Sequence, residues 1–139
     1  MRYVAVDPGT RRSGLAVWDT DGGIPLPAGV VEHGDDAAGD LADAARQLGA
    51  DVLVVGLPRN ADGSEGPAAR AARHLAMRLA RMLGLLVGLL DERYTTAAAL
   101  QALEGRTPSE RARLVDTQAA VELLERLRAG EHLERATTE

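Results

Sequence analysis

The sequence predicts an α/β protein in which three N-terminal strands are followed by helices that alternate with further strands. Three observations support this prediction. A valine-rich run at residues 4–6 ends on Asp7, turns through Gly9 and is followed by a second apolar run, which indicates two paired strands. Residues 52–55 are continuously apolar, as is typical of a strand buried on both faces. Residues 67–83 separate apolar side chains from arginines around a helical wheel.

The remaining elements follow from turn signals and helix caps. Short connections between the first three strands predict an antiparallel meander. The expected strands are residues 2–7, 14–19, 28–32, 51–56 and 85–90. The expected helices are residues 35–48, residues 67–83, a segment from Thr95 or Thr96 to about Gly105, and residues 115–128. Residues 106–114 are expected to form a mobile loop, and the polar tail from Glu131 is expected to fray.

The length and composition are those of one globular unit. The chain has 139 residues, of which 45% are hydrophobic, so we expect a single domain over residues 1–130 and a polar tail over residues 131–139. No apolar run approaches the ~20 residues that a membrane helix needs, and no signal-peptide pattern is present. The absence of cysteine excludes disulfides and thiolate metal sites. These features predict a cytoplasmic protein with no membrane partner.

The charge is unevenly distributed along the chain. A net charge of -5 argues against nonspecific binding of polyanions by the whole surface. The basic side chains other than histidine are all arginine, and they gather in residues 59–93 and 106–113, whereas acids gather in residues 32–51 and in the tail. A segregated surface of this kind can still offer one basic face to phosphates. The arginine face of residues 67–83 is either such a face or simply solvated.

Acidic residues stand at three informative places. Asp7 ends the first strand, Asp91 and Glu92 end the last strand, and Asp116 opens the final helix. On a helical wheel Asp116 points to the same side as Ala120, and a lone buried carboxylate costs several kcal/mol unless a cation or hydrogen bonds compensate it. Two of these positions also have a simpler interpretation. Asp7 opens an Asp-Pro-Gly-Thr sequence that is an ordinary turn, and Asp116 is suited to capping a helix.

A shared divalent cation would explain the three acids together. Ligands that are all oxygen suit Mg²⁺ or Mn²⁺ rather than zinc. Two such ions ~4 Å apart activate a water and stabilise the leaving oxygen of a phosphodiester. The histidines, His33, His74 and His132, show no metal-ligand spacing and are expected at the surface.

Four segments in order carry a family resemblance. They are residues 6–14 (VDPGTRRSG), 55–64 (VGLPRNADGS), 91–96 (DERYTT) and 115–120 (VDTQAA). Together they resemble the YqgF/RuvX family of RuvC-like Holliday junction resolvases. The resemblance implies an RNase H-like fold, with a five-stranded mixed sheet in the order 3-2-1-4-5 flanked by helices. It also implies a metal-dependent nuclease that acts on Holliday junctions and other branched DNA or on the 5′ end of precursor 16S ribosomal RNA.

The resemblance assigns Asp7, Glu92 and Asp116 as the catalytic, metal-binding acids. One departure stands out, because RuvC-type resolvases carry an acid at the end of the fourth strand, where this chain has Gly56-Leu57. We expect Glu92 to take over that role from the neighbouring strand, with Asp91 and Glu65 as alternatives.

Arginines close to these acids are the expected phosphate-binding groups. They are Arg11, Arg12, Arg59, Arg93, Arg106, Arg111 and Arg113. The acidic residues 35–43 are expected to face away from them. If branched DNA is the substrate, two symmetric cuts require two active sites, so we expect a homodimer.

Two other functions are compatible with parts of the sequence. Asp-x-Gly-Thr followed by a glycine also resembles the first phosphate loop of actin-like ATPases, but those folds need two such domains and an adenosine pocket. A nucleic-acid-binding module that keeps the fold without chemistry is the non-enzymatic alternative. Metal-independent binding without cleavage would favour that module.

Overall fold

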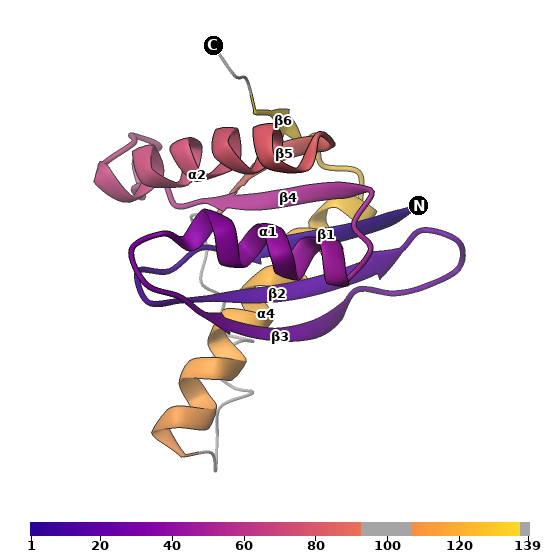
Figure 1. Cartoon of the computed structure of the whole chain (residues 1–139), viewed down its shortest axis with the longest axis horizontal. Helices are drawn as coiled ribbons and strands as arrows, with labels where there is room; N and C mark the ends of the chain where they lie inside the picture. The colour runs from indigo at the N-terminus through magenta and orange to yellow at the C-terminus, as the bar shows by residue number, and fades with distance from the viewer. Residues whose placement is uncertain (93–106, 137–139) are drawn as a thin grey trace.

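The fold is a six-stranded mixed sheet with helices on both of its faces (Figure 1). The computed structural model describes residues 1–92 and 107–136, and the side chains of these residues except 108–116. The strands are β1 (Arg2–Asp7), β2 (Arg12–Asp19), β3 (Leu26–Glu32), β4 (Val52–Leu57), β5 (Leu86–Asp91) and β6 (Glu134–Arg135). The helices are α1 (Ala37–Gln47), α2 (Pro67–Leu83) and α4 (Pro108–Arg128). The helix expected near residues 95–105 lies outside the described residues.

The strand order is β3-β2-β1-β4-β5-β6, which confirms the expected 3-2-1-4-5 arrangement and adds a sixth strand. The first three strands form the antiparallel meander, and β4 and β5 continue from β1 in parallel. In a parallel group all carboxyl ends lie at one edge. The ends of β1, β4 and β5 therefore meet at the same edge of the sheet.

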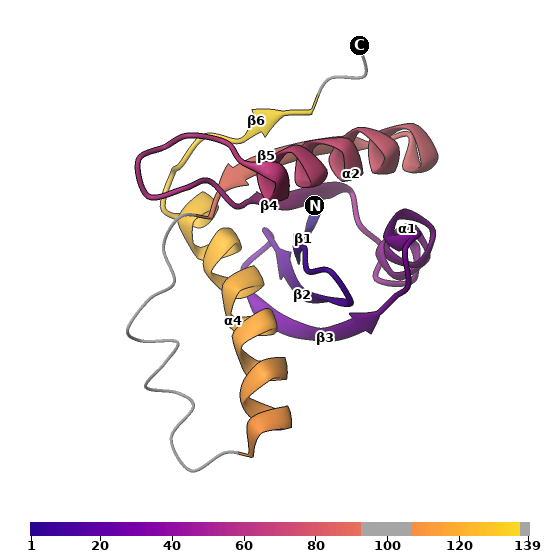
Figure 2. The ribbon, with the colours of Figure 1, turned by 90° about the vertical axis from the view of Figure 1, so that its left-hand side faces the viewer.

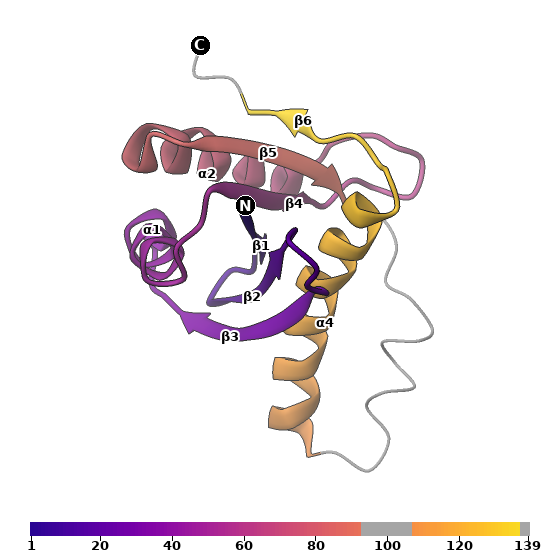
Figure 3. The ribbon, with the colours of Figure 1, turned by 90° about the vertical axis from the view of Figure 1, so that its right-hand side faces the viewer.

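The two faces of the sheet bury separate clusters of side chains. The side views show α1 and α2 on one face and α4 on the other (Figures 2 and 3). On one face, Val4 and Val6 of β1 pack with the apolar residues of α1 and α2. On the other face, Ala5 packs with Ala120 and Leu123 of α4. Because side chains of a strand alternate between faces, even and odd positions of β1 meet different helices.

Residues 108–114, expected to be a loop, belong to α4. Thr107 precedes Pro108, and proline is well suited to the first position of a helix because its missing N–H has no helical partner there. The charged residues that follow are good helix formers. A high density of charge was thus a poor indication of a loop.

The C-terminal tail is bound to the sheet rather than frayed at residues 134–136. Glu134 and Arg135 pair antiparallel with β5, and the Ala136 N–H donates to the Val87 carbonyl at 2.9 Å. A Cβ at Gly88 would lie 2.1 Å from Leu133 Cγ, so the glycine leaves the room that the leucine fills. The tail therefore continues the sheet.

Two smaller features complete the fold. Met82 belongs to the apolar side of α2 on the helical wheel, but its side chain is 41% exposed, because Leu79 and alanines of α2 fill the core under this helix. None of the helices in the described part of the chain combines the length and the apolar character that a bilayer crossing requires.

Candidate active site

Asp7 lies between two glycines at the carboxyl edge of the sheet. Its partner across β2 is Gly14. On the other side Val6 pairs with Val55 of β4, so the next residue of β4, Gly56, follows beside Asp7. Strand alternation puts Asp7 on the same face as Ala5, which is the face covered by α4. The residues next to half-buried Asp7 on both neighbouring strands are therefore glycines.

The Glu92 carboxylate occupies the space above Gly56. A Cβ on Gly56 would lie 2.5 Å from Glu92 Oε2 and 2.9 Å from Glu92 Oε1, so only glycine fits there without displacing the acid. The Glu92 N–H donates to the Leu57 carbonyl at 2.9 Å, which ties the end of β5 to the end of β4. The carboxylate of an acid that directly follows β5 therefore lies above the end of β4, where the resemblance to RuvC-type resolvases leads us to expect an acid.

Asp91 and Glu65, the two alternatives to Glu92 as a metal-binding acid, form ion pairs with arginines. Arg73 donates to Glu65 at 2.6 Å and 2.7 Å, and these bonds, with the nearby charge of Arg59, lower the pKa of Glu65 to about 2. Arg59 also lies 3.7 Å from Asp91 and 3.8 Å from Glu134 of β6. We call Arg59, Glu65, Arg73, Asp91 and Glu134 the arginine–carboxylate network.

A second arginine fixes the strand end that carries Glu92. Arg126 of α4 donates to the backbone carbonyl of Asp91 and to Glu131. The end of β5 is therefore held by the Asp91 side chain on the network, by the Asp91 backbone on α4, and by the Glu92 N–H on β4. This bracing limits where the Glu92 carboxylate can move.

Asp116 lies on α4, the helix that covers the face with Asp7 and Glu92. It stands four residues before Ala120, which is fully buried against this face. Its side chain lies outside the described part of the structure, as do those of Arg111 and Arg113. Among the side chains that are described, no group of three His, Asp or Glu forms a metal site.

The turn after Asp7 is braced by residues that sequence reasoning missed. The Gly9 N–H donates to Ser13 Oγ at 3.3 Å, and Ser13 Oγ lies 2.9 Å from His33 Nε2. Ser13 is fully buried, and His33 is half-buried rather than simply at the surface. A Cβ at Gly9 would lie 2.2 Å from the Arg12 carbonyl oxygen, so the turn needs glycine there. In the sequence, the one hint of this bracing is a serine, Ser13, placed between the glycines that follow Asp7.

The expected phosphate-binding arginines are in different situations. Arg11 is exposed and Arg12 begins β2, so both flank the turn after Asp7. Arg59 contacts three carboxylates of the network. Arg93 and Arg106 lie outside the described residues.

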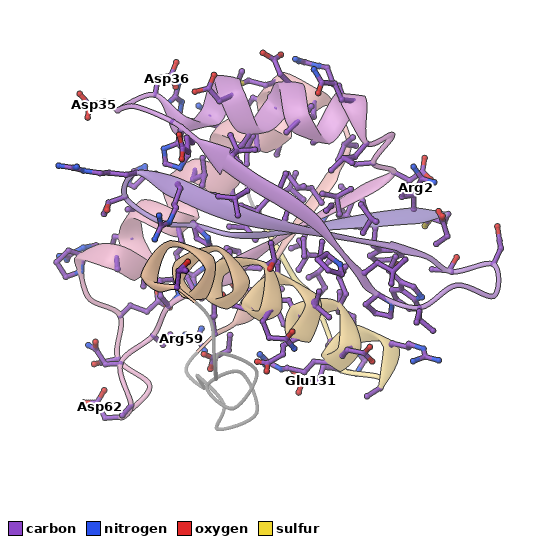
Figure 4. The ribbon with its side chains drawn as sticks, turned by 90° about the horizontal axis from the view of Figure 1, so that it is seen from below. Arg2, Asp35, Asp36, Arg59, Asp62 and Glu131 are labelled. Carbon is purple, nitrogen blue, oxygen red and sulfur yellow. The ribbon has the colours of Figure 1, made fainter. Side chains whose placement is uncertain are left out.

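The acidic residues 35–43 are only partly remote from these arginines. Asp36 and Asp35 extend on one side of the molecule and Arg59 lies on the opposite side (Figure 4). Asp36 accepts a hydrogen bond from Arg78 of α2 at 3.1 Å. Asp35, however, lines a hollow together with Arg11 and Arg12, so it does not face away from the basic side chains.

A mixed sheet in this order, covered on both faces and carrying acids at its carboxyl edge, is the RNase H-like arrangement of junction resolvases. The Thermus thermophilus RuvC structure is similar to this chain with a TM-score of 0.55 and 11% identity, covering 97% of this chain and 99% of that chain. The fowlpox virus resolvase in complex with Holliday junction DNA gives a TM-score of 0.59 and 10% identity over 91% of this chain and 96% of that chain. At these identities the likeness establishes the fold.

The family follows from sequence comparison. The model of the RuvX family, described as Holliday junction resolvase, matches residues 1–127, and the chain belongs to this family of nucleases. A relative from Anaeromyxobacter sp. (strain Fw109-5) is 42% identical over 95% of this chain and 99% of its own length. A relative from Acidiphilium cryptum (strain JF-5) is 41% identical over 89% of this chain and 81% of its own length. Both are named as candidate pre-16S rRNA nucleases.

Proposed function

We propose that this chain is a divalent-cation-dependent nuclease of one catalytic domain, in which Asp7, Glu92 and Asp116 hold Mg²⁺ or Mn²⁺. The position of the Glu92 carboxylate above Gly56, on the face that Asp7 shares, carries this proposal. Asp7 ends β1 and Glu92 follows β5, with β4 between them. Two carboxylates held close together on one face of the sheet repel each other at neutral pH unless a cation lies between them.

The residues present fit such a cation. The donors are all carboxylate oxygens, which is the ligand type that Mg²⁺ and Mn²⁺ prefer. Gly14, the partner of Asp7 on β2, places no side chain beside the two acids. When bound, the metal would activate a water and offset the charge on the leaving oxygen of a phosphodiester. The chain itself fixes the strand ends through Glu92, Asp91 and Arg126, so that the carboxylates keep their geometry during the reaction.

The substrate that we propose is the 5′ end of precursor 16S ribosomal RNA. Relatives that are about 40% identical over most of the chain are named as candidate pre-16S rRNA nucleases, whereas the resolvase bound to a Holliday junction shares only the fold. Arg11, Arg12, Arg93, Arg106, Arg111 and Arg113 are the groups we propose for the phosphates. Arg59 would add to them only by exchanging a carboxylate for a phosphate.

Branched DNA is the second candidate, and the description of the family as Holliday junction resolvases favours it. Two symmetric cuts would then require a homodimer. We propose the outermost strand, β3, as the dimer interface, since Leu26 on it is 51% exposed and Ile24 just before it is 55% exposed. A monomer in sedimentation at micromolar concentration would favour a single-strand or precursor-RNA substrate over this candidate.

The direct test compares cleavage of precursor 16S ribosomal RNA, four-way junctions, flaps and single strands with and without Mn²⁺. We expect Asp7→Asn to abolish cleavage and to keep most of the affinity, because the affinity comes from arginines. Asp40→Asn, an exposed acid on α1, is the matched control and should cleave normally. Cleavage by purified Asp7→Asn protein would refute the proposal. Binding of nucleic acid by the wild type without cleavage in the presence of Mn²⁺ would favour the inactive binding module.

A further inference from the structure

We infer that Ser13 and His33 are positioning residues for Asp7, acting through a directed chain of hydrogen bonds that ends on the Gly9 amide. The inference rests on the proposed nuclease function for its activity measurement. The chain itself can be tested without any cleavage assay.

The three contacts of this chain are all short enough to be hydrogen bonds. The Gly9 N–H lies 3.3 Å from Ser13 Oγ, Ser13 Oγ lies 2.9 Å from His33 Nε2, and His33 Nδ1 lies 3.1 Å from the Gly34 carbonyl oxygen. The His33 backbone N–H also donates to the Arg11 carbonyl at 2.9 Å. The end of β3 is therefore attached to the turn after Asp7 at two points.

The direction of each bond follows from the chemistry of the groups. The Gly34 carbonyl can only accept, so Nδ1 of His33 carries the hydrogen. In the neutral imidazole Nε2 is then an acceptor, and the Ser13 hydroxyl donates to it. The lone pairs of Ser13 Oγ remain available for the Gly9 N–H. One tautomer of His33 thus satisfies all three contacts at once.

The hydrogen-bond chain affects Asp7 because the short, closely packed turn passes any movement of Gly9 on to Asp7. Gly9 lies two residues beyond Asp7, and its α-carbon is packed against the Arg12 carbonyl. Ser13 is fully buried, so without His33 its hydroxyl would lose the partner that orients it. A misplacement of about 1 Å in a catalytic group can lower a rate about a hundredfold. A loosened Gly9 amide would allow a shift of that kind at Asp7.

Four variants test the inference. Ser13→Ala removes the acceptor for Gly9, and His33→Leu removes the acceptor for Ser13. His33→Gln keeps a polar atom at a similar reach and should rescue the loss seen with leucine. His74→Leu is the matched control, because His74 is an exposed histidine of α2 that lines the same 560 Å³ pocket as His33 and Gly9.

We expect Ser13→Ala and His33→Leu each to lower kcat about tenfold or more, with KM changed less than about twofold. The double variant should be no slower than the slower single variant, because both break one chain. His33→Gln and His74→Leu should stay near the wild type. Unchanged kcat in folded Ser13→Ala and His33→Leu proteins, or full additivity in the double variant, would overturn the inference.

Hydrogen exchange of the Gly9 amide separates this inference from the proposed function. Exchange should be faster in Ser13→Ala and His33→Leu than in the wild type and should return towards the wild-type rate in His33→Gln. If the wild type shows no nuclease activity but Gly9 follows this pattern, the proposed function fails and the hydrogen-bond chain stands. If Gly9 exchanges equally fast in all variants, the chain does not hold the turn. Should Ser13→Ala fail to fold, the two His33 variants still decide between these outcomes.

Discussion

At the residue scale, the candidate site depends on glycines, which place no side chain beside the acids, as much as on the acids themselves. Gly14 and Gly56 flank Asp7 on both neighbouring strands. The space above Gly56 is taken by the Glu92 carboxylate, which comes from the next strand along the sheet. A side chain at position 56 of β4 and the Glu92 carboxylate after β5 would therefore occupy the same space, and this chain has only the Glu92 carboxylate there.

Gly56→Ala should disable the site without unfolding the protein. The added Cβ would lie 2.5 Å from Glu92 Oε2, so the carboxylate must leave its position above Gly56. We expect a loss of stability of about 1–3 kcal/mol from crowding, together with a large fall in Mn²⁺-dependent cleavage. Gly39→Ala on α1 is the control, because its Cβ would meet only Asp36 Oδ2 at 3.6 Å and alanine favours a helix. Normal cleavage by Gly56→Ala would mean that the position of Glu92 is unimportant.

At the scale of elements, β6 and the arginine–carboxylate network connect the tail to the site. Glu134 of β6 lies within ion-pair distance of Arg59 and Arg73, and Arg59 in turn lies 3.7 Å from Asp91, next to Glu92. Leu133 fills the gap left by Gly88 on β5. The last strand thus supports the end of β5 from its outer side.

Leu133→Ala should destabilise the protein by about 2 kcal/mol, since it empties the space above Gly88. Leu86→Ala, at the start of β5 and 39% exposed, is the matched control and should cost clearly less. Urea unfolding monitored by circular dichroism measures both. Equal effects of the two variants would show that the tail does not pack on β5 in solution.

The network also predicts a dependence of stability on acid pH. Hydrogen bonds from Arg73 hold the pKa of Glu65 at about 2, well below its usual value near 4.5. The stabilisation from a lowered carboxylate pKa is fully present above pH 4.5 and is lost as the pH falls towards 2. Glu65→Gln should therefore be less stable than the wild type at pH 6, and this difference should shrink between pH 4.5 and 2.

The matched control for this prediction is Glu125→Gln, which removes an exposed carboxylate that lies 3.6 Å from Arg128. Its stability should stay close to that of the wild type at every pH. Thermal unfolding at several pH values measures the three proteins. A difference between Glu65→Gln and the wild type that stays constant down to pH 2 would contradict the prediction.

At the scale of the whole molecule, the sheet separates two environments. The helices α1 and α2 cover one face and α4 covers the other (Figures 2 and 3). The Arg78–Asp36 pair lies with α1 and α2, whereas strand alternation puts Asp7, and the Glu92 carboxylate above Gly56, on the face of α4. A net charge of -5 does not prevent binding of nucleic acid if the arginines gather near the acids. The arginines that precede Asp116 are the main candidates for such a cluster.

Replacing Arg106, Arg111 and Arg113 by alanine together should weaken binding of nucleic acid to a similar extent on unrelated sequences. Each lost phosphate contact should flatten the slope of log affinity against log salt by roughly 0.7 to 0.9. A triple variant of Arg46, Arg78 and Arg81, which belong to α1 and α2, removes the same charge from the other face. That control should keep the slope. An equal change in both triple variants would show that only net charge matters.

Much of the fold could be predicted because its signals are local. The apolar run at residues 52–55 and the two-sided wheel of residues 67–83 correspond to β4 and α2. The segment 108–114 was misjudged, because a charged sequence suits both an exposed helix and a loop. His33 was overlooked because its partner, Ser13, lies on another strand.

The sequence by itself determined the alternation of strands and helices, the place of Asp7 at a strand end and the membership of the family. Those features depend on side-chain spacing and on short motifs, which are read along the chain. Only the tertiary structure decided that the Glu92 carboxylate lies above Gly56 and that β6 pairs with β5. It also decided that Glu65 and Asp91 form ion pairs with Arg73 and Arg59. Each of these depends on strands that pair across a long stretch of sequence, and no local pattern records which residue will fill the space that a distant glycine leaves.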